Sequence, residues 1–196
     1  MIKVYACGDT RSRRVLWACE EVGAPYEVVE LRWPPRLHHP EYLAISPSGA
    51  VPAIEDGDLR LIESLAICEY VSRKAASDIH LEPSDPCYFE YLQLLQFGDA
   101  TFAPPVGWAR RLGPLSDKVA AEARTAFGLR LKVIEAALAD GREHIAAGRF
   151  TIADISVAFT LTLAQQSGLG DLLPPAVEAY VDRMKARSAY QRAYAK

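Results

Sequence analysis

The chain has 196 residues, of which 50% are hydrophobic and 24% charged, with 13 prolines and 12 glycines spread along its length. This composition is that of an ordinary globular protein and argues against a disordered, collagen-like or coiled-coil chain. The formal net charge is −3 at pH 7, and 9 basic and 12 acidic residues precede position 81, while 13 of each follow it. Neither part has the positive excess that binding to a phosphate backbone requires, so no nucleic-acid partner is expected.

The start of the chain and its cysteines predict a cytoplasmic protein. Residues 1–7 are too short an apolar stretch, and too soon followed by arginines, for a secretory signal. No stretch reaches the roughly 20 apolar residues that span a bilayer, so no membrane partner is expected. The cysteines show neither a CxxC pair nor zinc-ligand spacing; they are Cys7, Cys19, Cys68 and Cys87. We therefore expect reduced thiols and no bound metal.

Strand and helix signals alternate at the start of the chain. Residues 2–7 are mostly apolar and β-favouring, and they end at Gly8-Asp9. A helix with apolar residues at helical spacing follows, up to Gly23, and residues 26–31 form a second strand. A strand, a helix and a strand within about thirty residues indicate a βαβ unit, whose two strands are parallel.

A loop and a hairpin come next. Residues 32–48 contain four prolines and two histidines and predict a loop with one short helix. Residues 51–54 and 59–62 are two short strands, joined through Asp56-Gly57. Because Asp-Gly tolerates the positive φ of a tight turn, this joint predicts a β-hairpin.

A helix from Glu63 to about Lys74 completes the first domain. The predicted order is β-α-β-α-β-β-α, which makes residues 1–78 a small α/β domain. Residues 79–86 are the predicted linker, and residues 87–196 have helical periodicity only, which predicts an all-α domain.

Three helices dominate this second part. The first begins near Tyr88 and must bend or end at Pro104-Pro105, because a proline inside a helix removes a hydrogen bond. The second ends at Gly141, and the third begins after a capping box that starts at Thr151. The third helix is apolar on most sides, so we expect it in the core and away from any substrate.

Three sequence motifs occur in order along the chain. They are Ser-Gly-Ala-Val-Pro-Ala-Ile at 48–54, Ile-Glu-Ser-Leu-Ala-Ile at 62–67 and Phe-Thr-Ile-Ala-Asp-Ile at 150–155. Together they resemble the cytosolic glutathione S-transferase family, in a bacterial or fungal-like form that uses serine or threonine. The resemblance covers residues 2–194. It implies a thioredoxin-like, glutathione-binding N-terminal domain and a helical domain that forms a hydrophobic substrate site.

The resemblance assigns glutathione contacts to the first two motifs. The family holds the bond before Pro52 in cis, so that the backbone of Val51 pairs with the cysteinyl residue of glutathione. Ser64 would bind the carboxylate of the γ-glutamyl group, and Glu63 would face its ammonium. A helix N-terminus suits the carboxylate, because its N–H groups are unpaired and carry partial positive charge.

Two positions depart from the family's pattern. Ala50 stands where a Lys, Gln or Arg often precedes Val-Pro, and Ser46 replaces a common Asn. His38 or His39, in the preceding loop, would then contact the glycyl carboxylate of glutathione. A neutral histidine supplies one hydrogen bond but no fixed charge, so weaker glutathione binding is expected.

The implied chemistry is activation of a thiol. A free thiol has a pKa near 8.5, so only about 3% is thiolate at pH 7, and the enzyme must lower that value. Thr10, at the position of a family serine, and Ser12 are the candidate hydroxyl donors to the sulfur, though either can simply cap the helix. Tyr5 and Cys7 are further alternatives; cysteine-using classes form mixed disulfides with glutathione.

The second substrate is expected to be a hydrophobic electrophile, as in detoxification reactions. The residues predicted to line its site on the helical domain are Phe97, Thr101, Phe102, Trp108 and Arg111. The resemblance thus implies a homodimeric glutathione transferase with no metal. A glutathione-dependent isomerase, peroxidase or dehalogenase and a non-catalytic binding or regulatory module remain alternatives.

Overall fold

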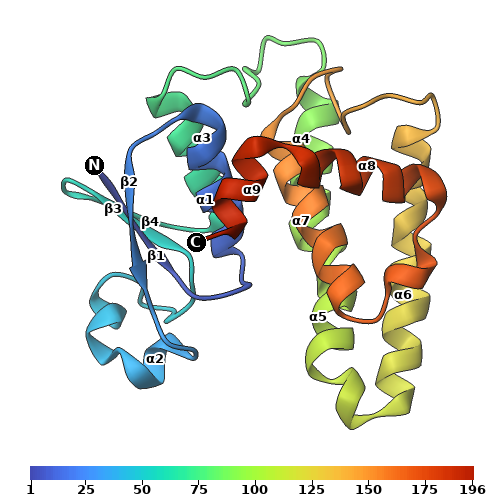
Figure 1. The fold of residues 1–196 in the computed structure, drawn as a ribbon, viewed down its shortest axis with the longest axis horizontal. Coiled ribbons are helices and arrows are strands. Elements are labelled where there is room, and N and C mark those ends of the chain that lie inside the picture. The colour runs from blue at the N-terminus through green and yellow to red at the C-terminus, as the bar shows by residue number, and fades with distance from the viewer. The chain divides into compact units, whose positions relative to one another are not determined.

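The computed structural model describes residues 1–196 and divides them into two units (Figure 1). Unit 1 comprises Met1–His80 together with Ser188–Lys196, and unit 2 comprises Leu81–Arg187. The boundary at position 80 falls inside the predicted linker. The placement of Ser188–Lys196 corrects the predicted boundaries, which put these residues in the helical domain. They lie in unit 1 because their aromatic and charged side chains pack on the first helix.

Unit 1 is built on a four-stranded mixed sheet with the strand order β2-β1-β3-β4. Its strands are β1 (Ile2–Ala6), β2 (Tyr26–Glu30), β3 (Ala53–Asp56) and β4 (Leu59–Ile62). β1 and β2 are parallel, as predicted, whereas β3 is antiparallel to both β1 and β4. The hairpin turns at Gly57, whose φ of 61° confirms the predicted tight turn.

The strand β3 begins at Ala53, later than the predicted start at Val51. Its first paired residue is Ala53, opposite Tyr5 of β1. Pro52 has no N–H to donate to the ladder, so the pairing starts only after it. Val51 therefore lies next to the sheet and outside its ladder.

Three helices of unit 1 follow the predicted order, and two others, at residues 35–38 and 188–194, were not predicted in this domain. The helices are α1 (Ser12–Val22), α2 (Pro35–His38), the 3-10 helix η1 (Pro40–Ala44), α3 (Ser64–Lys74) and α9 (Ser188–Tyr194). α1 packs on both α3 and α9, and Figure 1 shows α9 beside α1. The buried side chains of these three helices are mostly apolar; they include Val15, Leu16, Trp17, Ile67, Val71 and Tyr190.

Unit 2 is helical throughout. Its α-helices are α4 (Tyr88–Gln96), α5 (Ala103–Arg111), α6 (Asp117–Leu138), α7 (Ile152–Gln166) and α8 (Pro175–Ala186). Short 3-10 turns lie at Gly113–Leu115 and Gly170–Leu172. None of the helices combines the length and the apolar character needed to cross a bilayer.

The helix predicted to bend or end at Pro104-Pro105 is interrupted before them. A π-helical turn, Phe97–Thr101, separates α4 from α5, and both prolines lie in the first turn of α5, where the missing N–H groups would be unpaired anyway. Side chains of α7 satisfy two carbonyls at this turn: the Ser156 hydroxyl donates to the carbonyl of Leu95 at 2.9 Å, and the Thr160 hydroxyl to that of Gly98 at 2.9 Å.

The core of unit 2 is centred on α7. Every residue from Thr151 to Thr162 is buried, which confirms the core position predicted for this helix. The predicted capping box is present, with the Thr151 N–H donating to Asp154 Oδ2 at 2.8 Å. Asp154 Oδ1 also accepts the Ile145 N–H at 2.9 Å and the Tyr180 hydroxyl at 3.0 Å. The carboxylate therefore fixes the loop before α7 and helix α8 as well as the helix start.

Candidate active site

The turn between β1 and α1 carries the two predicted hydroxyls. The Thr10 hydroxyl donates to Ser12 Oγ at 3.0 Å, and the Ser12 N–H donates back to Thr10 Oγ1 at 3.3 Å. Ser12 is fully buried, whereas Thr10 is partly exposed. Of the two, only Thr10 offers its hydroxyl to a ligand at the surface of unit 1. Its position at the start of α1 adds the partial positive charge of the helix N-terminus.

The start of α3 is tied to this turn through a buried arginine. Arg14 is fully buried, and its Nη1 donates to Ser64 Oγ at 3.2 Å. The Cys68 thiol of α3 donates to the Arg14 carbonyl at 3.5 Å. The sequence analysis did not name Arg14 and so missed this role. The sequence feature that could have indicated this role is its position: Arg14 lies four residues after Thr10, on the apolar side of α1.

Glu63 and Ser64 lie where β4 passes into α3. Glu63 has φ 71° and ψ 107°, a conformation that costs a non-glycine residue on the order of 1–3 kcal/mol and that occurs mostly at functional sites. Its carbonyl accepts the first helical bond, from the Ile67 N–H at 2.9 Å. The exposed Glu63 carboxylate thus stands beside the unpaired N–H groups of the helix start. This pair of opposite charges suits the ammonium and carboxylate of an amino-acid group.

The peptide bond between Val51 and Pro52 is cis, as the resemblance implied. Two side chains from the preceding loop hold the segment before it, because the Tyr42 hydroxyl and the Ser46 hydroxyl both donate to the Ala50 carbonyl, at 2.8 and 3.0 Å. These contacts were not foreseen from the sequence. They fix the approach to Val51 through the backbone of Ala50, so the missing side chain at position 50 does not leave the segment unsupported.

The two histidines of the loop differ in what they contact. His39 Nε2 accepts the Arg32 N–H at 3.1 Å, and its Nδ1 lies 3.3 Å from Glu41 Oε1, so both ring nitrogens are engaged within the loop. His38 is exposed at the end of α2. Of the predicted pair, His38 is therefore the residue with its ring open to a ligand.

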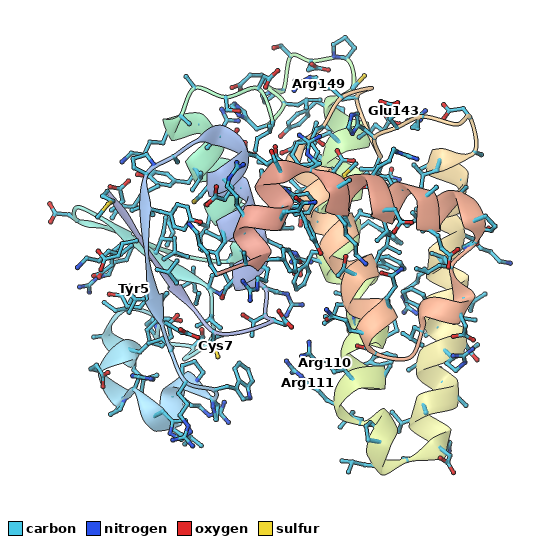
Figure 2. All side chains as sticks on the ribbon, in the orientation of Figure 1. Tyr5, Cys7, Arg110, Arg111, Glu143 and Arg149 are labelled. Carbon is cyan, nitrogen blue, oxygen red and sulfur yellow. The ribbon has the colours of Figure 1, made fainter.

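Tyr5 and Cys7, the alternatives for contact with sulfur, lie in β1 and directly after it (Figure 2). Both are poorly suited to that contact. The Tyr5 hydroxyl donates to Glu55 Oε2 at 2.5 Å, and burial together with this bond raises the pKa of Tyr5 to about 12. Cys7 is buried at the end of β1, and burial raises the pKa of its thiol. A reactive cysteine needs the opposite shift, toward thiolate.

The residues predicted to line the substrate site differ in their surroundings in the structure: one lies in the core and others are exposed. Phe102 has no exposed surface and stacks between Phe97 and Phe127, with ring centroids 5.6 and 4.9 Å away. Phe102 is therefore a core residue, which corrects its prediction as a lining residue. Thr101 and Arg111 are exposed, and 39% of Trp108 is exposed.

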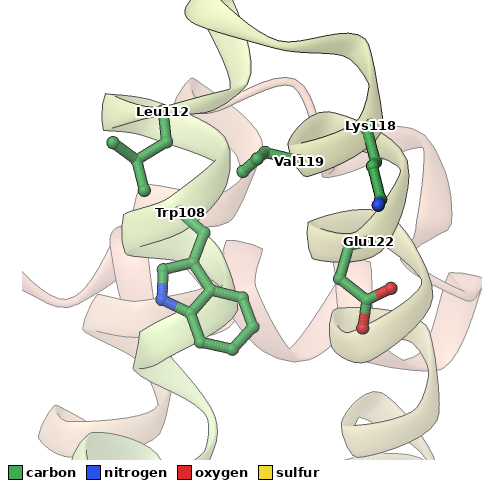
Figure 3. A pocket seen from close by; sticks show the side chains of 5 residues that line it. All are labelled: Trp108, Leu112, Lys118, Val119 and Glu122. Carbon is green, nitrogen blue, oxygen red and sulfur yellow. The ribbon is translucent and has the colours of Figure 1, made fainter.

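A hollow of about 540 Å³ lies between α5 and α6 in unit 2 (Figure 3). Its lining consists of an indole, two aliphatic side chains and an acid and a base at the rim: Trp108, Leu112, Val119, Lys118 and Glu122. Trp108 is its only residue that the sequence analysis had named. Helical periodicity along α6 marks the buried face of that helix but does not show that Val119 lines an open space.

Metal-ligating residues do not gather anywhere in residues 1–196, because no group of three or more His, Cys, Asp or Glu side chains is arranged to hold an ion. The residues that the structure brings together in unit 1 are hydroxyl, backbone and charged groups. Their arrangement suits an elongated ligand with amino-acid character and a nucleophilic or anionic centre near Thr10.

Two protein-family models match the chain. One is described as "Glutathione S-transferase, N-terminal domain" and covers residues 7–79, and the other as "Glutathione S-transferase, C-terminal domain" and covers residues 117–183. A probable glutathione S-transferase of Oryza sativa subsp. japonica is 33% identical over 211 aligned residues, with 97% of this chain and 94% of the relative covered.

Solved structures share the fold over nearly their full lengths. Glutathione S-transferase-I bound with lactoylglutathione is 26% identical, with a TM-score of 0.84 over 99% of this chain and 98% of that chain. A glutathione transferase family member from Pseudomonas fluorescens Pf-5, solved with two glutathione bound, is 26% identical, with a TM-score of 0.85 over 98% and 92%. The predicted bacterial or fungal-like subtype is not confirmed by these matches. The family models and the full-length relative show that the chain belongs to the glutathione S-transferase family and is a glutathione transferase.

Proposed function

We propose that Thr10 activates the thiol of glutathione in this enzyme. The observation that carries the proposal is the contrast in exposure between Thr10 and the fully buried Ser12 at the start of α1. The Ser12 N–H donates to Thr10 Oγ1, and a hydroxyl that accepts a hydrogen bond becomes a better donor through it. When glutathione binds, the Thr10 hydroxyl turns from Ser12 Oγ to the sulfur and donates to it as the thiol ionises.

The reaction is nucleophilic attack by this thiolate. The thiol proton passes to solvent, and the sulfur then forms a bond to an electrophilic carbon of the second substrate. For a substitution, the leaving group departs with the electron pair of its bond to that carbon. A hydrogen bond to an ionised group is worth about 1.5–3 kcal/mol, enough to move the thiol from mostly protonated to mostly ionised near neutral pH.

The rest of glutathione extends from this sulfur along unit 1. Its γ-glutamyl carboxylate binds the Ser64 N–H and the start of α3, since the Ser64 side chain is itself buried against Arg14, and its ammonium faces Glu63. Its cysteinyl backbone pairs with Val51, which lies outside the ladder of the sheet. The glycyl carboxylate meets His38, since both ring nitrogens of His39 are engaged in the loop.

The second substrate is a hydrophobic electrophile bound on unit 2. The hollow between α5 and α6 supports this proposal, because the indole of Trp108 and the aliphatic Leu112 and Val119 offer an apolar surface of ligand size. Lys118 and Glu122 at its rim can orient a polar substituent of the substrate.

Steady-state kinetics of two matched variants test the role of Thr10. Thr10→Val keeps the shape of the side chain but removes its hydroxyl, so we expect kcat/KM near pH 7 to fall about tenfold to a hundredfold. The loss should shrink as the pH rises, because solvent then ionises the thiol unaided. Ser12→Ala removes a buried hydroxyl and should leave the pH dependence of kcat/KM unchanged. Unchanged profiles for Thr10→Val would contradict the proposal.

The proposal includes a homodimer in the cytoplasm. Exposed apolar side chains on the helical unit support self-association: 77% of Phe89 and 62% of Leu129 are exposed. All four cysteines are free, which fits a reducing compartment. Sedimentation at micromolar concentration should give twice the 21.6 kDa of the chain, and a species of 21.6 kDa would contradict the dimer.

A further inference from the structure

Arg13 links the Thr10 turn to a segment that is distant in sequence. Its backbone N–H donates to the Thr10 carbonyl at 3.0 Å, which fixes the start of its side chain relative to the turn. The side chain, only 12% exposed, then runs toward residues 188–196.

The Arg13 guanidinium is enclosed by groups of the turn and of the C-terminal segment. Its Nη1 donates to the carbonyls of Ala193 and Lys196, at 2.8 and 2.7 Å. Its Nε lies 3.4 Å from Asp9 Oδ1, and its central carbon lies 5.3 Å from the centroid of the Tyr194 ring. The last four carbonyls of a helix lack helical partners, so the Ala193 carbonyl, in the last turn of α9, is a ready acceptor for such a donor.

The segment that receives Arg13 is itself firmly attached to α1. The Tyr190 ring meets Trp17 edge-on, with centroids 5.0 Å apart, and stacks on Tyr194 at 4.0 Å. Glu20 accepts from Arg192 Nε at 2.6 Å and from Lys196 Nζ at 2.9 Å. These contacts attach residues 188–196 to α1 through side chains other than Arg13.

We propose that Arg13 is a positioning residue for thiol activation, which holds Thr10 in place by joining its turn to the C-terminal segment. The inference rests on the proposed role of Thr10. A hydroxyl must lie within hydrogen-bond reach of the sulfur, and a displacement of about 1 Å is enough to lose most of the catalytic effect. Arg13 anchors the turn from both sides, through Asp9 before Thr10 and through its own backbone after it.

A direct electrostatic effect of Arg13 on the thiolate makes a different prediction. If charge alone matters, Arg13→Lys keeps the effect and Arg13→Gln loses it. If position matters, both variants lose it, because neither side chain can reach Asp9 and the two carbonyls together as the planar guanidinium does. The two variants therefore separate the mechanisms in the full-length chain.

The measurement is the pKa of the thiol of bound glutathione, from the ultraviolet absorbance of the thiolate as the pH is raised. For both Arg13 variants we expect this pKa to rise by about one unit and kcat/KM near pH 7 to fall about tenfold. The Kd of glutathione should stay within about twofold, because the contacts at Ser64 and Val51 are untouched. In a Thr10→Val background, Arg13→Gln should cause no further rise.

Arg192→Ala is the matched control. It loosens the same segment at Glu20 but leaves the Arg13 contacts in place, so the melting temperature should fall while the thiol pKa stays unchanged. A shift of that pKa in Arg192→Ala equal to the shift in Arg13→Gln would overturn the proposal, as would a wild-type pKa in Arg13→Lys.

If Thr10→Val shifts the pKa and neither Arg13 variant does, the positioning role alone fails. If Thr10→Val itself has no effect, the role of Thr10 fails and that of Arg13 with it. Should Arg13→Gln not fold, Arg13→Lys in the wild-type and Thr10→Val backgrounds gives the same readouts.

Discussion

At the scale of single residues, exposure decides which of two neighbouring hydroxyls can serve a ligand. Thr10 and Ser12 are hydrogen-bonded to each other, and both lie where a helix begins. Spacing in the sequence leaves both as candidates, because each can cap α1. Burial separates them, since Ser12 is sealed under the turn while Thr10 opens to solvent.

The histidines of the α2 loop also differ in exposure and contacts: His38 is exposed, whereas both ring nitrogens of His39 are engaged within the loop. His38→Ala should raise the Kd of glutathione about threefold to tenfold, because it removes one hydrogen bond to the glycyl carboxylate. His39→Ala should instead lower the melting temperature, since the ring of His39 joins Arg32 to Glu41. Isothermal titration with glutathione and thermal unfolding measure the two effects. A larger loss of affinity in His39→Ala with unchanged stability would reverse the assignment.

Ala50 offers a gain-of-function prediction. It is exposed directly before Val51, where a longer polar side chain can reach a bound carboxylate. Ala50→Gln should lower the Kd of glutathione about threefold to tenfold, and Ala50→Leu, of similar size but without a donor, should not. Equal affinities for the two variants would show that position 50 does not meet the glycyl carboxylate.

At the scale of elements, the attachment of α9 to α1 depends on an ionised glutamate. Burial raises the pKa of Glu20, but hydrogen bonds from Arg192, Lys196 and Tyr26 outweigh it and hold the pKa at about 2, against an ordinary value of 4.5. The unfolded state therefore takes up a proton first as the pH falls. The stabilisation by Glu20 is complete above about pH 4.5 and disappears between there and pH 2.

Urea unfolding of wild type and Glu20→Gln over pH 2 to 7 tests this attachment. At pH 7 the wild type should be more stable by roughly 1–3 kcal/mol, and the difference should vanish toward pH 2. A difference between the two proteins that does not change with pH would mean that Glu20 acts through packing and not through its charge.

The π-helical turn gives a second prediction for an element. A Cβ at Gly98 would collide with Ser156 Oγ and come within 3.0 Å of the Ser156 carbonyl carbon, so Gly98→Ala should cost about 1–3 kcal/mol of stability. Gly128, inside α6, is the matched control, because a Cβ there meets nothing within 4 Å. Gly128→Ala should be neutral or stabilise by up to about 1 kcal/mol. Similar losses in both variants would contradict the close packing of this turn on α7.

At the scale of the whole molecule, the sequence predicted the parts that depend on local patterns. The βαβ unit, the Asp-Gly hairpin, the capping box of α7 and the order of the two units all follow from periodicity and turn chemistry. The cis bond between Val51 and Pro52 is present as the resemblance implied, and α3 begins at Ser64; that these residues contact glutathione stays a prediction. The hairpin and the capping box are each encoded within a few consecutive residues, and the βαβ unit within about thirty.

The features missed from the sequence depend on contacts between distant segments. The return of residues 188–196 to unit 1 depends on Tyr190 meeting Trp17, and nothing in a helical pattern shows which partner a helix chooses. The position of Phe102 in the helical sequence pattern does not distinguish a residue of the substrate site from a core residue. Only its stacking on Phe97 and Phe127 shows that it lies in the core. The buried Arg14 likewise acquires its role from Ser64, which is 50 residues away along the chain.

The central claim, that the Thr10 hydroxyl stabilises the thiolate of glutathione, is tested most directly by titrating the bound thiol in wild type, Thr10→Ser and Thr10→Val. Thr10→Ser keeps the donor, so its thiol pKa should stay within about half a unit of the wild-type value, well below the value of about 8.5 for a free thiol. Thr10→Val should raise that pKa by about one to two units at an unchanged Kd for the tripeptide. The same low pKa in all three proteins would contradict the claim.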